Sequence, residues 1–394
     1  MADRNSILAE ARALLASGQE AAADGLLVPL LQADPGDAEA MGLLAEARMA
    51  LTPENPMAHI LMATAEHRAG RPRRAIAHVH SALRLEPANA AALTLLGLCQ
   101  RDIGALDEAI AAFEAAAAQL PGSADAQLAL ANALRNGGRT EDAVAAYRAG
   151  LACDSRSVPL HSNLAVTLQQ LSEFDDARGH FEAALALAPE QAGIQHNLAV
   201  LDLLCGNFAA GFECYAWRWR KDGDVNRARP FPQCQWDGTP LGDKTILVWC
   251  EQGVGDEIMF ASLFNEVIAA AKRVIIECEA RLQPLFARSF PQAQVIARRD
   301  PPDDRLLAED IDVQSSAGDL CRWLRRDAAD FAEPRAFLRA DSDATKAARQ
   351  RYGTSPTGIA WHSKTPFWGD IKTAPLARWQ PILATPDGTG GNRH

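Results

Sequence analysis

The chain has 394 residues, of which 48% are hydrophobic and 23% charged, as expected of a folded protein with about two or three domains. The net charge of -11 leaves no basic surplus for phosphates, which argues against nucleic acid or an anionic membrane as a partner. The eight cysteines form no CxxC pair and no zinc-ligand spacing, which favours free thiols in a reducing compartment. With a charged start and no apolar run long enough to span a bilayer, the sequence predicts a cytoplasmic protein without membrane span, metal or cofactor.

An internal repeat of 34 residues dominates the first half of the chain. Its registers begin at residues 56, 90, 124, 158 and 192. In the register from 90 the fixed positions hold Leu93, Leu96, Gly97, Gly104, Ala109, Phe113, Ala116 and Pro121. This period and pattern are typical of tetratricopeptide repeats, whose helix pairs stack into an α-solenoid.

Small and aromatic residues have different roles in this pattern. Small residues such as Gly97 and Ala109 allow the two antiparallel helices of one repeat to approach closely. The aromatic position, held by Phe113, Tyr147 and Phe181, is expected to fill the gap against the next repeat. We therefore expect the solenoid to cover residues 56–220.

The first 55 residues are helical in pattern but out of phase with the later registers. Gly18 and Pro35 fit a repeat that starts near residue 4, whereas Gly36 and Pro53 fit one that starts near residue 22. We expect a degenerate helical cap over residues 1–55, with its phase open.

The concave face of the solenoid is the first candidate binding site. Its polar side chains are expected to be Arg101, Asn132, Arg135, Gln169 and His196. They predict a groove for an extended peptide or protein partner. The alternative is a solvated helix face, which every solenoid has.

Two stretches of the repeats also resemble a known enzyme. HSNLAVTLQQL (161–171) and HNLAVL (196–201) are similar to the repeats of the O-linked N-acetylglucosamine transferase of the cytoplasm and nucleus. In those repeats an asparagine lines the superhelix and holds the peptide backbone. The resemblance implies this role for Asn163 and Asn197, while Leu95 and Ala129 interrupt the series.

After residue 220 the periodicity stops, and a linker rich in proline and glycine is expected at 221–244. Apolar, β-branched runs then alternate with helical patterns, with strands at 245–249, 273–278, 294–298 and 311–316 and helices at 257–271, 281–290 and 318–324. This alternation predicts βαβ units and a parallel sheet in an α/β lobe over residues 245–340. A linker helix near 341–352, a strand at 357–361 and a helix at 376–383 predict an incomplete second α/β lobe at 341–385, before a flexible tail at 386–394.

The stretch EQGVGD (251–256) follows the first strand of this lobe and is the second candidate site. In an open parallel sheet, ligands bind at the carboxyl ends of the strands. Gly253 and Gly255 would let the backbone approach a ligand, and Asp256 opens the following helix. The stretch has neither a GxGxxG fingerprint nor a Walker lysine, so helix capping and catalysis are both open for Asp256.

Three stretches resemble a known family of enzymes. They resemble stretches of bacterial tetratricopeptide proteins that carry a domain related to glycosyltransferase family 9, which contains the ADP-heptose transferases. The stretches are WCEQGVGDEIMFASLFNEVI, VIIECEARLQPLFARSFP and GIAWHSKTPFWGDIKTAPLARWQPIL. The resemblance implies a GT-B arrangement of two Rossmann-like lobes, with the acceptor on the first lobe and a nucleotide sugar, the donor substrate, mainly on the second. It implies Asp256 as the general base, and it implies that the donor diphosphate is held by Ser363, Lys364, Lys372 and Thr373.

Two functions of different classes are consistent with these features. In the first, the solenoid selects a protein or glycan acceptor and the α/β lobe transfers a sugar to it. In the second, the chain is a non-enzymatic interaction scaffold whose α/β part is a structural remnant. The resemblance favours the first function. The second is favoured because residues 341–385 supply only the start of a donor-binding lobe.

Overall fold

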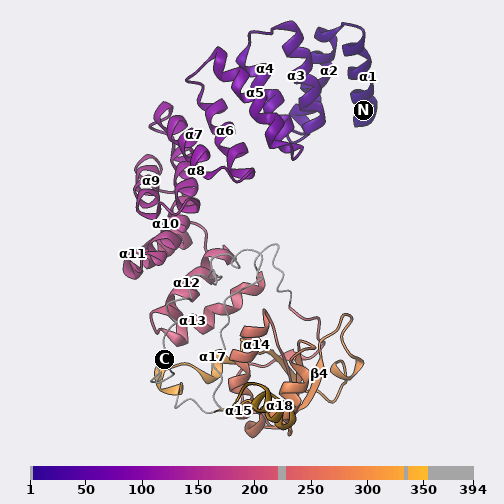
Figure 1. Ribbon diagram of the computed structural model, residues 1–394, viewed down its shortest axis with the longest axis vertical. Coiled ribbons are helices and arrows are strands. Elements are labelled where there is room, and N and C mark those ends of the chain that lie inside the picture. Colours follow the sequence, from indigo (N-terminus) through magenta and orange to yellow (C-terminus); the bar gives the residue numbers. More distant parts are fainter. Residues whose placement is uncertain (1–2, 221–227, 332–335, 354–394) are drawn as a thin grey trace.

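The computed structural model describes residues 3–220, 228–331 and 336–353. Thirteen α-helices form a curved row that leads from the N-terminus to an α/β lobe (Figure 1). Helices α1 to α13 span Arg4–Ala16, Glu20–Ala33, Ala38–Leu51, Pro56–Arg68, Pro72–Leu85, Ala90–Asp102, Leu106–Gln119, Ala124–Asn136, Thr140–Cys153, Val158–Gln170, Phe174–Leu187, Ala192–Leu204 and Phe208–Tyr215. Within the described ranges, no helix is long and apolar enough to cross a bilayer.

The 34-residue spacing is confirmed by the starts of the helices. The first helices of the five repeats, α4, α6, α8, α10 and α12, begin at Pro56, Ala90, Ala124, Val158 and Ala192. The second helices, α5, α7, α9, α11 and α13, follow at Pro72, Leu106, Thr140, Phe174 and Phe208. The chain therefore contains a regular helical solenoid.

The phase of the first three helices is resolved by their turns. Gly18 has a φ of 70° between α1 and α2, as Gly70 has a φ of 71° between α4 and α5, so α1 and α2 form a pair that starts near residue 4. Four-residue turns at 34–37 and 52–55 join α3 to its two neighbours. Helix α3 is thus an additional helix that shifts the later repeats into the register from 56. The alternative start near residue 22 lies inside α2.

Small and aromatic residues pack between the repeat helices. Phe113, Tyr147 and Phe181 are at most 2% exposed and belong to one apolar cluster that runs through several repeats. A Cβ atom on Gly97 would lie 2.8 Å from ring carbons of Phe113. Phe113 therefore packs directly on the first helix of its own repeat, and Leu134 of the next repeat belongs to the same cluster.

The α/β lobe contains a five-stranded parallel sheet in the order β1-β5-β2-β3-β4. Its strands are Cys234–Gln235, Gly242–Trp249, Ala271–Cys278, Gln294–Ala297 and Val313–Ser316. The predicted parallel sheet is confirmed. The short edge strand β1 and the first three residues of β2 lie within residues 221–244, where the sequence predicts a linker. The edge is formed because the N–H of Trp236 donates to the carbonyl of Gln314 at 2.8 Å and extends the pairing of β1 with β5.

The helices of the lobe are short. They are α14 Val254–Phe260, α15 Phe264–Ala270, α16 Gln283–Ser289, α17 Cys321–Leu324 and α18 Ser342–Tyr352. The single helix expected at 257–271 is divided into α14 and α15 by the 3₁₀ turn Ala261–Leu263. Helix α17 contains four of the seven residues for which the sequence predicts a helix, 318–324.

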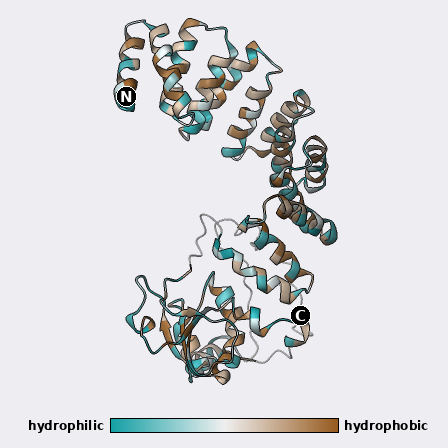
Figure 2. Ribbon diagram, turned by 180° about the vertical axis from the view of Figure 1, so that it is seen from behind, coloured by the Kyte–Doolittle hydropathy of each residue, from teal (hydrophilic) through white to brown (hydrophobic). Residues whose placement is uncertain are grey.

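Both faces of the central strands are buried. On one face, Ile246 and Ile276 pack against Phe264, Phe286 and Phe290. On the other face the apolar cluster consists mainly of Leu247, Trp249, Ile275, Ile296 and Leu306. Figure 2 shows hydrophobic and hydrophilic residues alternating along the helices of the chain. This two-sided core holds the carboxyl ends of β2 and β5 in fixed positions.

Candidate functional site

The carboxyl ends of β2 and β5 mark the point at which the sheet changes direction. From β2 the chain adds β3 and β4 on one side, and it then returns to place β5 on the other side of β2. Ligands of open parallel sheets bind in the crevice at such a point. Here it is bordered by the turn 250–253 between β2 and α14 and by Asp319 after β5.

Arg218 fills this position. Its side chain is 2% exposed, and its Nη2 lies 2.5 Å from Oε1 of Glu251 and 2.8 Å from Oδ1 of Asp319. Its Nε donates to Oε2 of Glu251 at 3.0 Å, and its Nη2 donates to Oγ of Ser316 at 3.0 Å. Burial lowers the pKa of Arg218, but the contacts with Glu251 and Asp319 outweigh burial and hold the pKa above its ordinary value. The guanidinium is therefore a fixed positive charge.

This arginine belongs to the end of the solenoid. It lies in the 3₁₀ turn η1, Ala216–Arg220, directly after α13. The rings of Tyr215 and Trp219 lie 4.3 and 4.2 Å from the guanidinium carbon. Trp219 also donates to Asp319 at 3.3 Å and packs at 5.2 Å on Trp249, as expected of a residue that joins solenoid and lobe. The last turn of the solenoid thus occupies the crevice of the sheet.

The two candidate sites meet at Tyr215. The ring of His196, a predicted groove residue on α12, lies 5.6 Å from the ring of Tyr215. Gln252, in the turn after β2, donates from Nε2 to the hydroxyl of Tyr215 at 2.8 Å. The end of the groove and the glycine-containing turn are therefore separated by one side chain.

Asp256 caps its own helix. Its Oδ2 accepts the N–H of Gly253 at 3.1 Å, at the start of α14. Its side chain is half-buried, whereas Gly253 and Gly255 are exposed. The role of base stays a prediction for Asp256. The resemblance assigns four further residues to the donor diphosphate, and all four lie outside the described residues. They are Ser363, Lys364, Lys372 and Thr373.

The predicted groove residues lie on consecutive first helices. They are Arg101 on α6, Asn132 and Arg135 on α8, Asn163 and Gln169 on α10, and His196 and Asn197 on α12. Oδ1 of Asn132 accepts from the hydroxyl of Tyr147 at 2.6 Å and from Nδ2 of Asn163 at 3.1 Å. Arg101 is exposed and pairs with Asp102 of the same helix at 2.9 Å. The other groove residues are partly accessible.

Three buried glutamates were not predicted from the sequence: Glu251 directly follows β2, Glu277 lies near the end of β3, and Glu257 lies in α14. Glu251, Glu257 and Glu277 are each at most 4% exposed. Their arginine partners are Arg218 at 2.5 Å, Arg298 at 2.6 Å and Arg229 at 2.6 Å. A glutamate at the end of an apolar run, as in VWCE and VIIEC, is a usable signal for such a residue. The arginines have no such signal, because they lie 33, 41 and 48 residues away along the chain.

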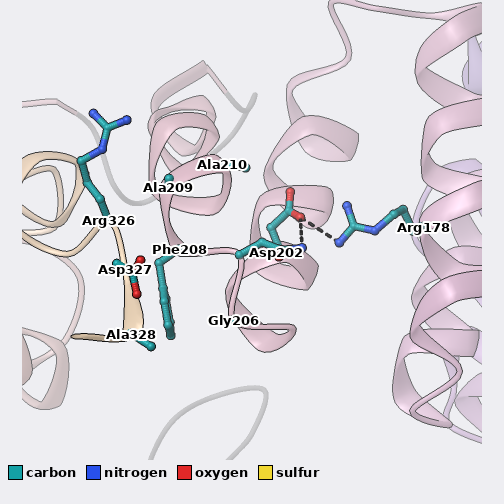
Figure 3. Close-up of a pocket in the computed structure, with 10 residues that line it drawn as sticks. Arg178, Asp202, Gly206, Phe208, Ala209, Ala210, Arg326, Asp327 and Ala328 are labelled. Atoms are coloured by element: carbon teal, nitrogen blue, oxygen red, sulfur yellow. Dashed lines mark hydrogen bonds and ion pairs between the residues drawn. The ribbon is translucent and has the colours of Figure 1, made fainter. Parts of the chain in front are cut away.

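Two cavities adjoin the junction of solenoid and lobe. One, of about 550 Å³, lies between helices α11 to α13 and the segment 326–328 of the lobe (Figure 3). On its solenoid side, Asp202 accepts from Asn207 at 3.2 Å and binds Arg178 at 2.8 Å. The other, of about 300 Å³, is lined by four tryptophans, Trp219, Trp236, Trp249 and Trp323, beside the carboxyl ends of β1, β5 and β2. Among the residues that the structure describes, no group of three or more His, Cys, Asp or Glu side chains is arranged around a metal position.

The helix pairs, their 34-residue spacing and their left-handed glycine turns define a tetratricopeptide-repeat protein. Two family models, both described as tetratricopeptide repeat, match residues 60–124 and 102–165. The curated protein FlbA of Caulobacter vibrioides is 30% identical over 202 residues. That match covers 47% of this chain and 34% of FlbA, so the chain spans about a third of the length of this relative.

Solved structures with similar repeats include YrrB and PilF. YrrB, described as a TPR protein with an unusual peptide-binding site, is 18% identical with a TM-score of 0.40, over 46% of this chain and 93% of YrrB. PilF of Pseudomonas aeruginosa is 15% identical with a TM-score of 0.42, over 56% of this chain and 93% of PilF.

Proposed function

We propose that this protein is an interaction scaffold whose repeat groove binds an extended segment of another protein. The observation that carries the proposal is the row of partly accessible amides on consecutive first helices, Asn132, Asn163 and Asn197. An amide side chain both donates and accepts hydrogen bonds, which suits an extended peptide backbone. The solvated-face alternative predicts no preferred peptide.

The junction also supports a scaffold. Arg218 closes the crevice in which an open parallel sheet ordinarily binds a small molecule, and it does so with buried ion pairs. This supports a lobe that closes the end of the solenoid and leaves partner binding to the repeats.

Panning a library of displayed random peptides on the full chain tests this function. We expect selected peptides to lose at least about tenfold in affinity for the variant Arg135→Ala/Asn163→Ala/Asn197→Ala, which equals about 1.4 kcal/mol. The control Glu141→Ala/Glu182→Ala changes exposed residues of second helices and should bind as the parent does. Equal binding by all three proteins would favour the solvated face.

Sugar transfer is a second candidate, favoured by the geometry of the lobe. The parallel strand order β4-β3-β2-β5 is compatible with a Rossmann-like sheet, which supports this hypothesis. Asp256 lies after β2, where the resemblance implies the base of a GT-B acceptor lobe. In this hypothesis the groove presents a protein or glycan acceptor, and Lys364 and Lys372 converge on Asp256. The last step of the groove, from His196 through Tyr215 to Gln252, leads toward this turn.

Calorimetry with nucleotide sugars separates the two candidates. If the chain is a scaffold, we expect no binding at micromolar concentrations, because Arg218 fills the crevice at the carboxyl ends of β2 and β5. If the lobe is a transferase, a fusion that adds a related second lobe after Leu383 should bind a nucleotide sugar. Tight donor binding by the chain itself would make the enzyme the better explanation.

A further inference from the structure

Two histidines face each other across the helices of the repeat that starts at Val158. The Nδ1 atoms of His161 on α10 and His180 on α11 are 2.9 Å apart, and the ring centroids are 5.2 Å apart. Nε2 of His161 lies 3.1 Å from the carbonyl oxygen of Ser155. Because a carbonyl can only accept, this nitrogen carries the hydrogen, and the lone pair of neutral His161 is on Nδ1. This lone pair on Nδ1 of His161 points at Nδ1 of His180.

We infer that His161 and His180 form a binding site for a divalent transition-metal ion, with Cu²⁺ and Ni²⁺ preferred. Metal-binding histidines ordinarily donate their second N–H to a carbonyl or carboxylate, as His161 does to Ser155. On metal binding, the hydrogen on Nδ1 of His180 moves to its Nε2 through solvent. Both imidazoles then stay neutral, and each offers a lone pair to the ion.

The separation of the two nitrogens selects the metal. With metal–nitrogen bonds of about 2.05 Å, nitrogens 2.9 Å apart subtend about 90° at the ion. This is the angle between neighbouring ligands of square-planar or octahedral ions such as Cu²⁺ and Ni²⁺. Tetrahedral Zn²⁺ requires nitrogens about 3.3 Å apart, so it binds only if the two helices separate.

The surroundings leave room for solvent in the remaining ligand positions. Asp176, one turn before His180 on α11, favours a cation, and Arg148 on α9 opposes it. Nη2 of Arg148 lies 3.8 Å from Oδ2 of Asp176, so the opposite charges of the two side chains partly cancel at the site. No third His, Cys, Asp or Glu of the described ranges joins the pair, so water completes the coordination.

The repeats themselves provide matched controls. Equivalent positions hold His59 and His78 in the repeat from 56, Leu93 and Ala112 in the repeat from 90, and Gln127 and Ala146 in the repeat from 124. The rings of His59 and His78 are 6.4 Å apart, against 5.2 Å for His161 and His180. The variant His161→Gln/His180→Ala therefore copies a pair that this solenoid already accommodates.

Calorimetric titration of the full, tag-free, chelator-treated chain with NiCl₂ tests the site. We expect one Ni²⁺ per chain at pH 8, weaker binding of ZnCl₂, and weaker binding of Ni²⁺ at pH 5, because protonated imidazoles cannot bind the ion. The variant His161→Gln/His180→Ala should lose at least about tenfold in Ni²⁺ affinity. The variant His59→Leu/His78→Ala should bind Ni²⁺ as the parent does.

Electron paramagnetic resonance with one equivalent of Cu²⁺ gives an independent readout on the unaltered chain. Two equivalent nitrogen ligands are expected in the hyperfine pattern. Unchanged Ni²⁺ affinity in the His161→Gln/His180→Ala protein, or a Cu²⁺ spectrum with fewer than two nitrogens, would overturn the site.

Discussion

Ser172 holds a backbone conformation that suits glycine. It has a φ of 62° in the turn between α10 and α11, where neighbouring repeats place Gly138 and Gly206 with φ of 77° and 81°. A residue with a side chain loses roughly 1–2 kcal/mol of folding stability in this left-handed region. Glycine avoids this cost, but it loses more backbone entropy on folding than other residues, which cancels part of the gain. We expect Ser172→Gly to stabilise the protein by about 1 kcal/mol, measured by urea unfolding with circular dichroism. The reverse exchange, Gly138→Ser, should destabilise it by a similar amount, and a stabilised Gly138→Ser protein would contradict this account.

His78 should make the solenoid sensitive to acid. Burial, and then the charge of His59, hold the pKa of His78 below its ordinary value of 6.5, while Glu66 opposes them. Below about pH 6.5 the unfolded chain therefore binds more protons at this residue than the folded chain, and stability falls as the pH falls. Between pH 7.5 and 5.5, with chelator present, we expect the variant His59→Leu/His78→Ala to lose less stability than the parent in urea unfolding. An equal loss would show that His78 titrates normally.

At the level of helices, Gly97 sets the distance between α6 and α7. A Cβ at this position would meet three ring carbons of Phe113 at 2.8 to 2.9 Å, and the ring is buried. Gly97→Ala should therefore destabilise the solenoid by about 1–3 kcal/mol. In the control Gly179→Ala on α11, no heavy atom lies within 4 Å of the new Cβ, so the gain in helix propensity should stabilise the protein by about 0.5–1 kcal/mol. Thermal unfolding compares the two, and a neutral Gly97→Ala would mean that Phe113 moves aside at no cost.

The repeat helices and the larger strands can be predicted from the sequence because their patterns are local. A register such as the one from Ala90 places small and apolar residues at fixed positions, and the run TILVW is apolar on both faces. The two-residue strand β1 carries no such pattern, since its existence depends on pairing with β5. The ion pair between Arg218 and Glu251 could not be predicted for the same reason. They are 33 residues apart, and only the folded chain brings them together.

At the scale of the whole molecule, Arg218 joins the solenoid to the lobe. Arg218→Met leaves Glu251 and Asp319 without their cation, and an unpaired buried charge costs about 3–5 kcal/mol. We expect differential scanning calorimetry of this variant to show the lobe unfolding at a lower temperature, separately from the repeats. The double variant Arg218→Met/Glu251→Gln removes the unpaired glutamate as well and should recover part of the loss. If the single and double variants unfold alike, the buried pair does not couple the two parts.

The groove is the part of the molecule on which the proposed function depends. Photo-crosslinking with a library-selected peptide tests it most directly, with p-benzoylphenylalanine in place of Asn197 on α12 or, as a control, in place of exposed Glu182 on the second helix α11. A scaffold with a peptide-binding groove should crosslink the peptide from position 197 and not from position 182. Crosslinking from position 182 alone, or equally from both positions, would contradict the groove.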